Sequence, residues 1–279
     1  MRRYQRQWLI VTFCCLFGSM WLISYLADED DLERSGYHRP KRTNQKLNKI
    51  FWNCNRPNTI ALTFNDGPDS NSTWLAVEKL SARKVPATFY FTGKAIEQQS
   101  RLIKYLDRNP LFMLASHSLD HTDLSTILRK EAARRVTDQI GGGINALYQI
   151  TGKRFRHFRP VNGAFDQFGK TADYPWLLSV DMWTLYSNDL EYERTMARKQ
   201  RLSLSEKVNY IGERIRRDLK MQWQDLETAD WNKGFIYKGH NRQLIVRALD
   251  SVIDFFKEKG LRFVRMDECT EVPETLPVI

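Results

Sequence analysis

Residues 60–68 read IALTFNDGP, an apolar run followed at once by polar and turn-forming residues. The run from Ile60 to Phe64 is rich in β-branched and aromatic residues, as a buried strand is. The NDGP stretch then ends the strand, so Asp66 lies where the strand meets a loop. Enzymes with α/β barrel folds place their ligands at such strand ends.

Further along, the chain reads HSLDH from His117 to His121. Residues four apart share one face of a helical turn, so we expect both imidazoles to reach one metal ion. Together with Asp66 they fill three tetrahedral positions and leave the fourth for water, the open geometry of a hydrolytic zinc site. This pattern predicts a metal-dependent hydrolase.

Apolar runs alternate with helical patterns along the chain, which predicts a parallel sheet. The expected strands are residues 59–64, 86–91, 111–115, 155–158, 176–182, 234–238 and 261–265, and the expected helices include 73–83, 94–107, 127–149, 205–219 and 242–259. In this interpretation Asp66, His117, Arg159 and His240 all lie at carboxyl ends of strands.

The TFNDGP and HSLDH stretches resemble the first two motifs of the polysaccharide deacetylases, carbohydrate esterase family 4 with its NodB homology domain. The resemblance covers about residues 54 to 270 and implies a distorted (β/α) barrel of about seven parallel strands. In the family the first motif carries two Asp residues, a general base and then a metal ligand. Here Asn65 occupies the base position, while Asp66, His117 and His121 match the metal ligands, which implies zinc or another divalent metal such as cobalt.

Two later stretches resemble the third and fourth motifs of this family. FRPVNGAF (158–165) places Arg159 as the residue that orients the base, with Pro160 beside it in the substrate-binding part. WTLYSNDL (183–190) places Asp189 as the carboxylate that tunes the catalytic His, and Leu190 in a substrate-binding position where the family usually has Trp.

GFIYKGH (234–240) resembles the fifth motif, which implies that His240 protonates the leaving amine. Lys238 stands where the family usually carries Leu, and Tyr186 in the fourth motif replaces the usual Asp.

The N-terminal segment from Trp8 to Leu26 holds nineteen residues without a charge. As a helix it would measure about 28 Å, close to the thickness of a bilayer. It is a membrane span or a signal sequence, and we favour an uncleaved anchor because a bulky Tyr25 stands two residues before Ala27. Arginines precede it and acidic residues follow it, which predicts a single-pass type II protein with its main domain lumenal or extracellular.

The expected organisation is therefore a cytoplasmic tail (1–7), a transmembrane anchor (8–26), a stalk (27–53), the deacetylase-like domain (54–270) and a short tail (271–279). Only Cys54 and Cys269 lie in the outer part of the chain, and two cysteines in an oxidising compartment are candidates for a disulfide. The resemblance sharpens this expectation, since fungal chitin deacetylases carry bridging cysteines at both ends of the domain, and it favours a fungal-type member. Asn71 begins an N-S-T glycosylation sequon.

The formal net charge is +10, and many of its basic residues crowd residues 194–220. This is either a solvated helical face or a surface that attracts an anionic polymer or lipid headgroups. A nucleic-acid partner is not expected for a domain outside the cytosol.

Three functional hypotheses follow. The first is a hydrolase that removes N-acetyl groups from an N-acetylglucosamine polymer such as chitin, weakened because the amide of Asn65 cannot take up a proton. The second is a catalytically silent carbohydrate-binding pseudoenzyme of the same fold, and the third is a membrane-tethered interaction protein. The metal ligands and His240 occur together, which favours the first.

Overall fold

The computed structural model describes residues 49–127, 131–165, 177–228 and 232–276. The expected cytoplasmic tail, the anchor and most of the stalk lie outside these residues. Within the described part of the chain, no helix is both long and apolar enough to cross a bilayer.

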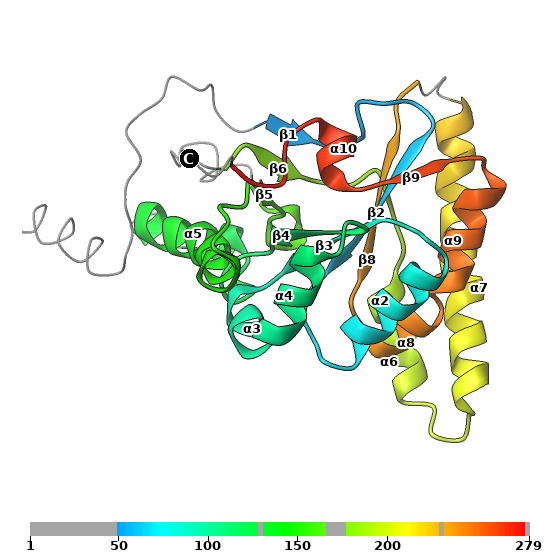
Figure 1. Ribbon diagram of the computed structural model, residues 1–279. Helices are drawn as coiled ribbons and strands as arrows, with labels where there is room; N and C mark the ends of the chain where they lie inside the picture. The colour runs from blue at the N-terminus through cyan, green and yellow to red at the C-terminus, as the bar shows by residue number, and fades with distance from the viewer. Residues whose placement is uncertain (1–48, 128–130, 166–176, 229–231, 277–279) are drawn as a thin grey trace, which may run out of the picture. The chain divides into compact units, whose positions relative to one another are not determined.

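In the described part of the chain, nine strands form one sheet, and all of its ladders are parallel, as expected (Figure 1). They are β1 (Lys49–Phe51), β2 (Thr59–Asn65), β3 (Ala87–Phe91), β4 (Phe112–Ser116), β5 (His157–Phe158), β6 (Ser179–Asp181), β7 (Leu185–Tyr186), β8 (Phe235–His240) and β9 (Arg262–Val264). The order along the sheet is β1-β6-β5-β4-β3-β2-β8-β7, and β9 pairs with β2 in addition.

The sheet curls into a distorted half-barrel. Strand β6 stands near one end of the strand order and β7 at the other, yet only residues 182–184 connect them. Three residues span roughly 10 Å, so the two ends of the sheet must approach each other. Thr184 bridges this gap, because its N–H donates to the carbonyl of Ile236 (2.9 Å) and its hydroxyl to the carbonyl of Trp52 (2.7 Å). No described ladder joins β1 to β7, so the barrel is open, and it has nine strands rather than about seven.

Helices pack around this sheet (Figure 1). They are α2 (Ser72–Ala82), α3 (Gly93–Gln98), α4 (Ser100–Arg108), α5 (Ala132–Thr151), α6 (Asp189–Ala197), α7 (Leu204–Thr228), α8 (Gln243–Arg247), α9 (Leu249–Glu258) and α10 (Met266–Thr270), with short 3-10 turns η1 (Leu124–Thr126) and η3 (Val161–Gly163). The expected helix 94–107 is two helices, because the backbone leaves helical geometry at Gln99 (φ −128°, ψ 37°). The expected helix 242–259 is likewise interrupted, at Ala248.

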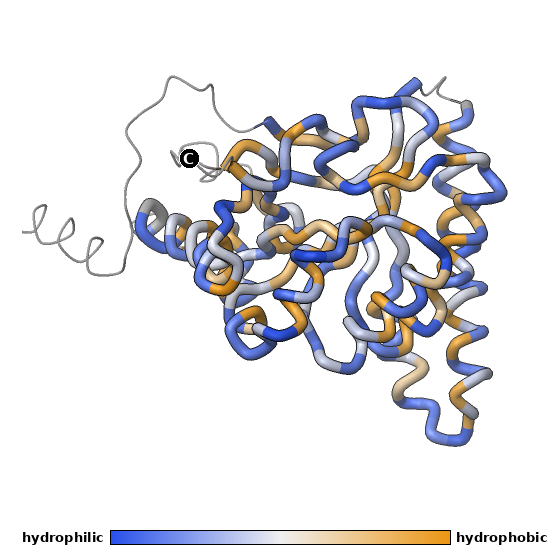
Figure 2. The backbone as a smooth tube through the Cα atoms, in the orientation of Figure 1, coloured by the Kyte–Doolittle hydropathy of each residue, from blue (hydrophilic) through white to orange (hydrophobic). Residues whose placement is uncertain are grey.

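Successive side chains of β2 lie on opposite faces of the sheet, one face in the apolar core and the other toward Arg159. Ile60, Leu62 and Phe64 belong to the large core between the sheet and the helices. The alternate residues Thr63 and Asn65 are also buried, but they contact the side chain of Arg159. Figure 2 shows hydrophilic and hydrophobic residues alternating along the helices that surround the sheet.

The folded unit extends beyond the expected limits 54–270 at both ends. Strand β1, within the expected stalk, pairs with β6, and past residue 270 the Glu274 carboxylate accepts a hydrogen bond from the N–H of Leu114 (2.8 Å). The disulfide between Cys54 and Cys269 is confirmed and ties the two ends together.

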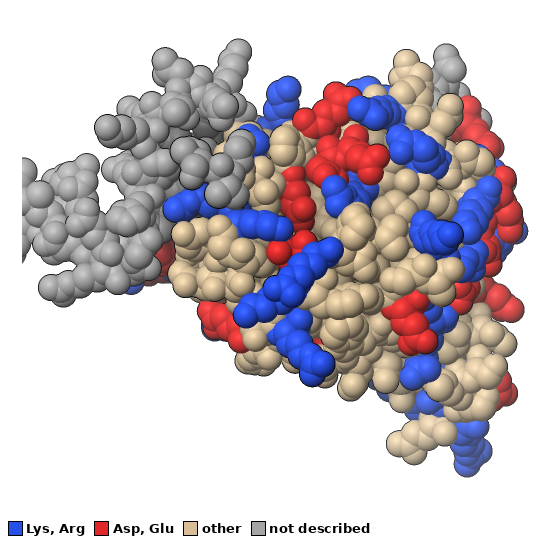
Figure 3. Space-filling view, viewed as in Figure 1, with Lys and Arg blue, Asp and Glu red and all other residues tan. Residues whose placement is uncertain are grey.

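The basic stretch of α6 and α7 is interleaved with acidic side chains. Arg216 pairs with Glu258 of α9, and Arg194 lies 3.8 Å from Glu191. Figure 3 shows Lys and Arg beside Asp and Glu along the edge where α7 and α9 lie. This arrangement fits a solvated, ion-paired face.

Candidate metal centre and the adjoining pocket

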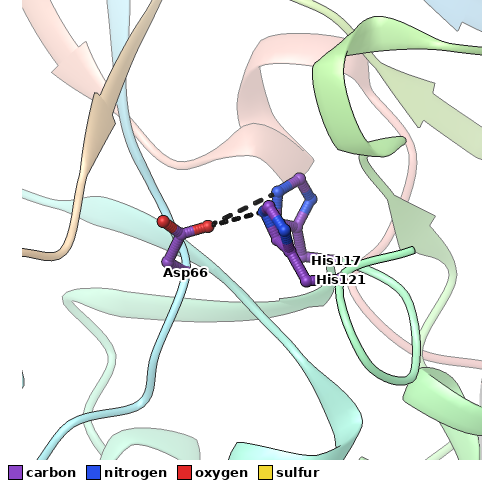
Figure 4. Close-up of side chains that lie close together, drawn as sticks. All are labelled: Asp66, His117 and His121. Carbon is purple, nitrogen blue, oxygen red and sulfur yellow. Dashed lines mark ion pairs between the residues drawn. The ribbon is translucent and has the colours of Figure 1, made fainter. Parts of the chain in front are cut away.

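The candidate metal ligands come from the carboxyl ends of β2 and β4. Asp66 follows β2 directly, His117 follows β4, and His121 lies on the loop after it. The Asp66 Oδ1 atom lies 3.1 Å from Nε2 of His121 and 3.8 Å from Nε2 of His117 (Figure 4). One ligand atom from each residue therefore falls within a group no wider than 4.8 Å.

The two imidazoles do not share a helical turn, so that part of the expectation was wrong. Residues 117–121 form a loop in which Ser118 (φ 75°) and His121 (φ 67°) take left-handed backbone geometry. The Ser118 hydroxyl accepts a hydrogen bond from the N–H of His121 (3.0 Å) and fixes this turn. The loop brings both rings to the same side by tight turning instead of helical periodicity.

The turn after β2 aims Asp66 at these rings. Both Asp66 (φ 68°) and Gly67 (φ 80°) are left-handed. A Cβ atom at Gly67 would lie 2.5 Å from Nδ2 of Asn241, so this position requires glycine.

Hydrogen bonding fixes which nitrogen His117 presents. Its Nδ1 lies 2.8 Å from the carbonyl oxygen of Arg159. A carbonyl only accepts, so Nδ1 carries the proton and Nε2 presents its lone pair toward Asp66. Burial lowers the pKa of His117 to about 3, which keeps the ring neutral, as a metal ligand must be.

Charge at this site is arranged for a cation. Burial opposes ionisation of Asp66, but contact with His121 and the fields of His117 and His240 outweigh it and hold the carboxyl pKa well below its usual range. The Asp66 Oδ1 atom is buried and makes no hydrogen bond, although two imidazole nitrogens face it. A carboxylate oxygen and two ring nitrogens that converge without hydrogen bonding fit the ligand set of a divalent metal such as zinc.

Arg159 is completely buried beside the metal-ligand candidates and bonds only to neutral acceptors. Its Nη1 donates to the hydroxyl of Thr63 (2.6 Å) and to Oδ1 of Asn65 (3.0 Å), and its other donors reach the backbone carbonyls of residues 181 and 182. A guanidinium can only donate, so the amide oxygen of Asn65 faces Arg159. The remaining polar group of Asn65 is an NH₂ donor.

His240 and Asp189 form a second constellation one strand away. Both carboxylate oxygens of Asp189 accept from His240, one from its ring Nδ1 (2.8 Å) and one from its backbone N–H (3.0 Å). His240 is the register partner of Asn65 in the β2–β8 ladder, so it adjoins the expected base position. With Nδ1 committed to Asp189, the Nε2 atom is the one left for chemistry.

Two of the other expected residues adjoin Arg159 and Asp189 in the chain. Pro160 is buried immediately before η3, and Leu190 is partly buried in the first turn of α6, where its N–H donates to Asp189 Oδ1 (2.9 Å). Asn71 is exposed at the start of α2.

Sequence reasoning missed a buried ion pair behind Arg159. The imidazole of His157 lies between Oδ2 of Asp181 (2.9 Å from Nδ1) and the carbonyl of Val272 (2.9 Å from Nε2). Both neighbours are acceptors, so both nitrogens carry protons. Burial opposes this charge, but Asp181 raises the pKa of His157. An isolated His and an Asp in separate short strands carry no sequence signal of such pairing.

Two basic residues near the pocket also carry no motif signal of their contacts. The guanidinium of Arg242 lies 3.7 Å from Oδ2 of Asp66. The ammonium of Lys238 lies 4.3 Å from the ring centre of Trp183.

The model of the polysaccharide deacetylase family matches residues 53–172. The chain carries a polysaccharide deacetylase domain. Among curated deacetylases, the peptidoglycan-N-acetylmuramic acid deacetylase PdaA of Bacillus subtilis is 28% identical over 144 residues, which cover 49% of this chain and 53% of PdaA. The chain thus spans about half the length of this relative.

Solved structures share the deacetylase fold. The chitin deacetylase of the fungal pathogen Colletotrichum lindemuthianum aligns with a TM-score of 0.61 and 22% identity, over 80% of this chain and 91% of that one. BA3943, a CE4 family pseudoenzyme from Bacillus anthracis, aligns with a TM-score of 0.59 and 19% identity, over 82% of this chain and 72% of that one. Bacterial and fungal proteins both match, so the comparisons do not single out the fungal type.

Proposed function

We propose that this chain is a metal-dependent deacetylase that hydrolyses N-acetyl groups of an amino-sugar polymer, with activity limited by Asn65. The observation that carries the proposal is the convergence of Asp66, His117 and His121 beside the His240–Asp189 pair. A structural metal site would not need a buried, carboxylate-held imidazole next to it.

The metal side of the site has the donor set for zinc, and cobalt suits the same ligands. When bound there, such an ion supplies Lewis-acid chemistry toward an amide carbonyl and an attacking water. The Nδ1 proton of His117 is held by the Arg159 carbonyl, which orients this ring for Nε2 ligation.

The acid side of the site depends on His240. Asp189 accepts hydrogen bonds from the ring Nδ1 and from the backbone N–H of His240, which fixes the ring and leaves Nε2 to deliver a proton to the departing amine. His240 ends β8, the ladder partner of the strand β2 that Asp66 follows, so the pair adjoins the metal-ligand candidates.

The base position is altered. The Asn65 amide cannot accept a proton at neutral pH, and its oxygen is already bonded to Arg159. Loss of a general base removes roughly 10²–10⁴ in rate, so we expect slow turnover.

The substrate class comes from the relatives. PdaA acts on N-acetylmuramic acid units of peptidoglycan, by its name, and the Colletotrichum protein on chitin. We propose an N-acetylated polysaccharide of this kind as the partner of this chain.

Asn65 also favours a second candidate, a carbohydrate-binding pseudoenzyme of the same fold. BA3943 is described as a pseudoenzyme, and a mutant of it as having restored enzymatic activity. A protein of this fold can therefore lose activity and recover it by mutation.

Release of acetate from N-acetylglucosamine oligomers by the full, zinc-loaded chain tests the proposal. We expect slow acetate release that a His240→Ala variant loses while it keeps its metal. If metal-loaded wild-type chain releases no acetate above the His240→Ala variant, the pseudoenzyme function replaces the deacetylase.

We further propose that the domain is lumenal or extracellular, anchored by residues 8–26 as a type II protein. The uncharged N-terminal run and its flanking charges support this, and so does the Cys54–Cys269 disulfide, since such bridges persist in oxidising compartments. Labelling of residues on either side of the span in intact cells would test the orientation.

A further inference from the structure

Lys238 lies on the pocket face of β8. It precedes His240 by two residues, so both side chains leave the same face of the strand. In the neighbouring ladders its register partners are Thr63 of β2 and Tyr186 of β7. The ammonium is therefore on the same side of the sheet as the Thr63–Arg159 contact.

Two aromatic rings hold the lysine. Its Nζ lies 4.3 Å from the ring centre of Trp183 and 5.5 Å from that of Tyr186. Lys238 and Trp183 are partly buried, and Tyr186 is 44% exposed, so this group opens to solvent. We call Lys238, Trp183 and Tyr186 the lysine–aromatic cluster.

No carboxylate among the described residues pairs with Lys238. Both oxygens of Asp189 are occupied by His240, and Asp66 faces the two imidazoles and Arg242. Burial lowers the pKa of Lys238, because the ammonium loses water without gaining an ion pair. A cation in this state binds an incoming anion with less desolvation cost than a fully hydrated one.

Other groups near Lys238 also favour an anion. The group that Asn65 leaves free is an NH₂ donor, since its oxygen accepts from Arg159. Arg159 has no carboxylate among its hydrogen-bond acceptors, and the nearby Asp181 is committed to His157 and Tyr90. Lys238 and Arg159 therefore have no carboxylate partner among the described residues, and the group that Asn65 leaves free is a donor.

We propose that the lysine–aromatic cluster is a subsite for a carboxylate, and that the favoured substrates are N-acylated amino sugars that carry one. The proposal rests on the proposed function for the choice of an amino sugar, and it does not require turnover. Lys238 would donate to the carboxylate, while Trp183 and Tyr186 supply apolar surface for the sugar ring. A neutral N-acetylglucosamine unit leaves the ammonium without a partner.

Binding to the metal-free full chain tests this, because a bound metal would itself attract carboxylates. The probes are N-acetylmuramic acid, its methyl ester and N-acetylglucosamine, titrated against the protein by NMR. We expect the acid to bind at least about tenfold more tightly than the other two, as a hydrogen bond to a charged group allows.

Lys238→Met keeps the length of the side chain and removes its charge. We expect it to weaken binding of the acid by about 10- to 100-fold, to leave N-acetylglucosamine within about twofold, and to preserve the thermal unfolding midpoint. Lys238→Arg keeps the charge and should retain most of the preference, which separates charge from packing. Equal affinities for the acid and its ester, or a preference that survives Lys238→Met in folded protein, would overturn the proposal.

The acetate-release assay keeps the two proposals apart. A carboxylate preference without hydrolysis leaves the subsite in place and removes the deacetylase function. Hydrolysis of neutral oligomers, together with equal affinities for N-acetylmuramic acid and its methyl ester, keeps the deacetylase function and removes the subsite.

Discussion

Replacing Asn65 by Asp would place a carboxylate where an amide oxygen now accepts a hydrogen bond from Arg159. The contact is 3.0 Å long, and the two residues are 4% and 0% exposed, so the exchange needs almost no change in volume. It would also give the buried guanidinium an anionic acceptor beside the metal-ligand candidates.

The expected gain in rate for Asn65→Asp follows from the contact with Arg159. A general base contributes roughly 10²–10⁴ in rate, and an adjacent cation lowers the basicity of a carboxylate. Because Arg159 would pair directly with the new Asp, we expect the lower end, about 100-fold, or roughly 2.7 kcal/mol in the activation barrier. The new ion pair should also stabilise the fold by up to about 1–2 kcal/mol, since the hydrogen bond to a charged group outweighs part of the desolvation of the carboxylate.

Acetate release from N-acetylglucosamine oligomers, at equal zinc content, measures the first effect, and denaturant unfolding the second. Asn65→Ala is the matched control, because it removes the amide without adding a base and should raise neither quantity. A stabilised, zinc-loaded Asn65→Asp variant with unchanged acetate release would refute the reasoning. The missing base would then not limit the rate of hydrolysis. The substitutions at Tyr186, Leu190 and Lys238 would limit it instead.

Three further outcomes are expected. His117→Ala should weaken zinc binding by more than about 100-fold, because even residues that only hydrogen-bond to metal ligands contribute about 10–100-fold to metal affinity. Competition with a chelator measures the affinity, and an unchanged value would exclude the site. Contact with Asp66 raises the pKa of His121 above its ordinary 6.5. Zinc affinity should therefore fall as the pH drops through this pKa, because protons then compete with zinc for Nε2. An affinity that stays constant from about pH 8 to 6 would contradict this. A Cys54→Ser, Cys269→Ser double variant should lose about 2–5 kcal/mol of unfolding free energy in denaturant, since the bridge joins residues 215 apart, and an unchanged midpoint would argue against it.

The fold was predictable where strands lie within apolar runs of the sequence. Seven apolar runs were expected as strands and all contain one, beginning with β2. Strands β1 and β7 were missed because neither was recognised as part of an apolar run, whereas the equally short β5 and β6 lie within the expected runs 155–158 and 176–182. The break at Gln99 was also invisible, since the apolar spacing continues from α3 into α4 although the backbone does not.

The site was predictable as a set of residues but not as a geometry. Asp66, His117, Arg159 and His240 do lie at strand ends, as the apolar runs indicated. The left-handed loop around His121 could not be foreseen, because such backbone geometry at Ser and His has no sequence signature. The contact of Lys238 with Trp183 joins segments that only the curled sheet brings together.

The two main departures from the family pattern change the pocket in the same direction. Asn65 removes a negative charge beside Arg159, and Lys238 adds a positive one two residues before His240 on the adjoining strand. A neutral acetamide gains nothing from this shift in potential, whereas an anionic ligand gains from both changes. Simple decay of an active site gives no reason for a partly buried ammonium to be held between two aromatic rings. These two changes therefore support the proposed carboxylate subsite over an active site that has only lost its base.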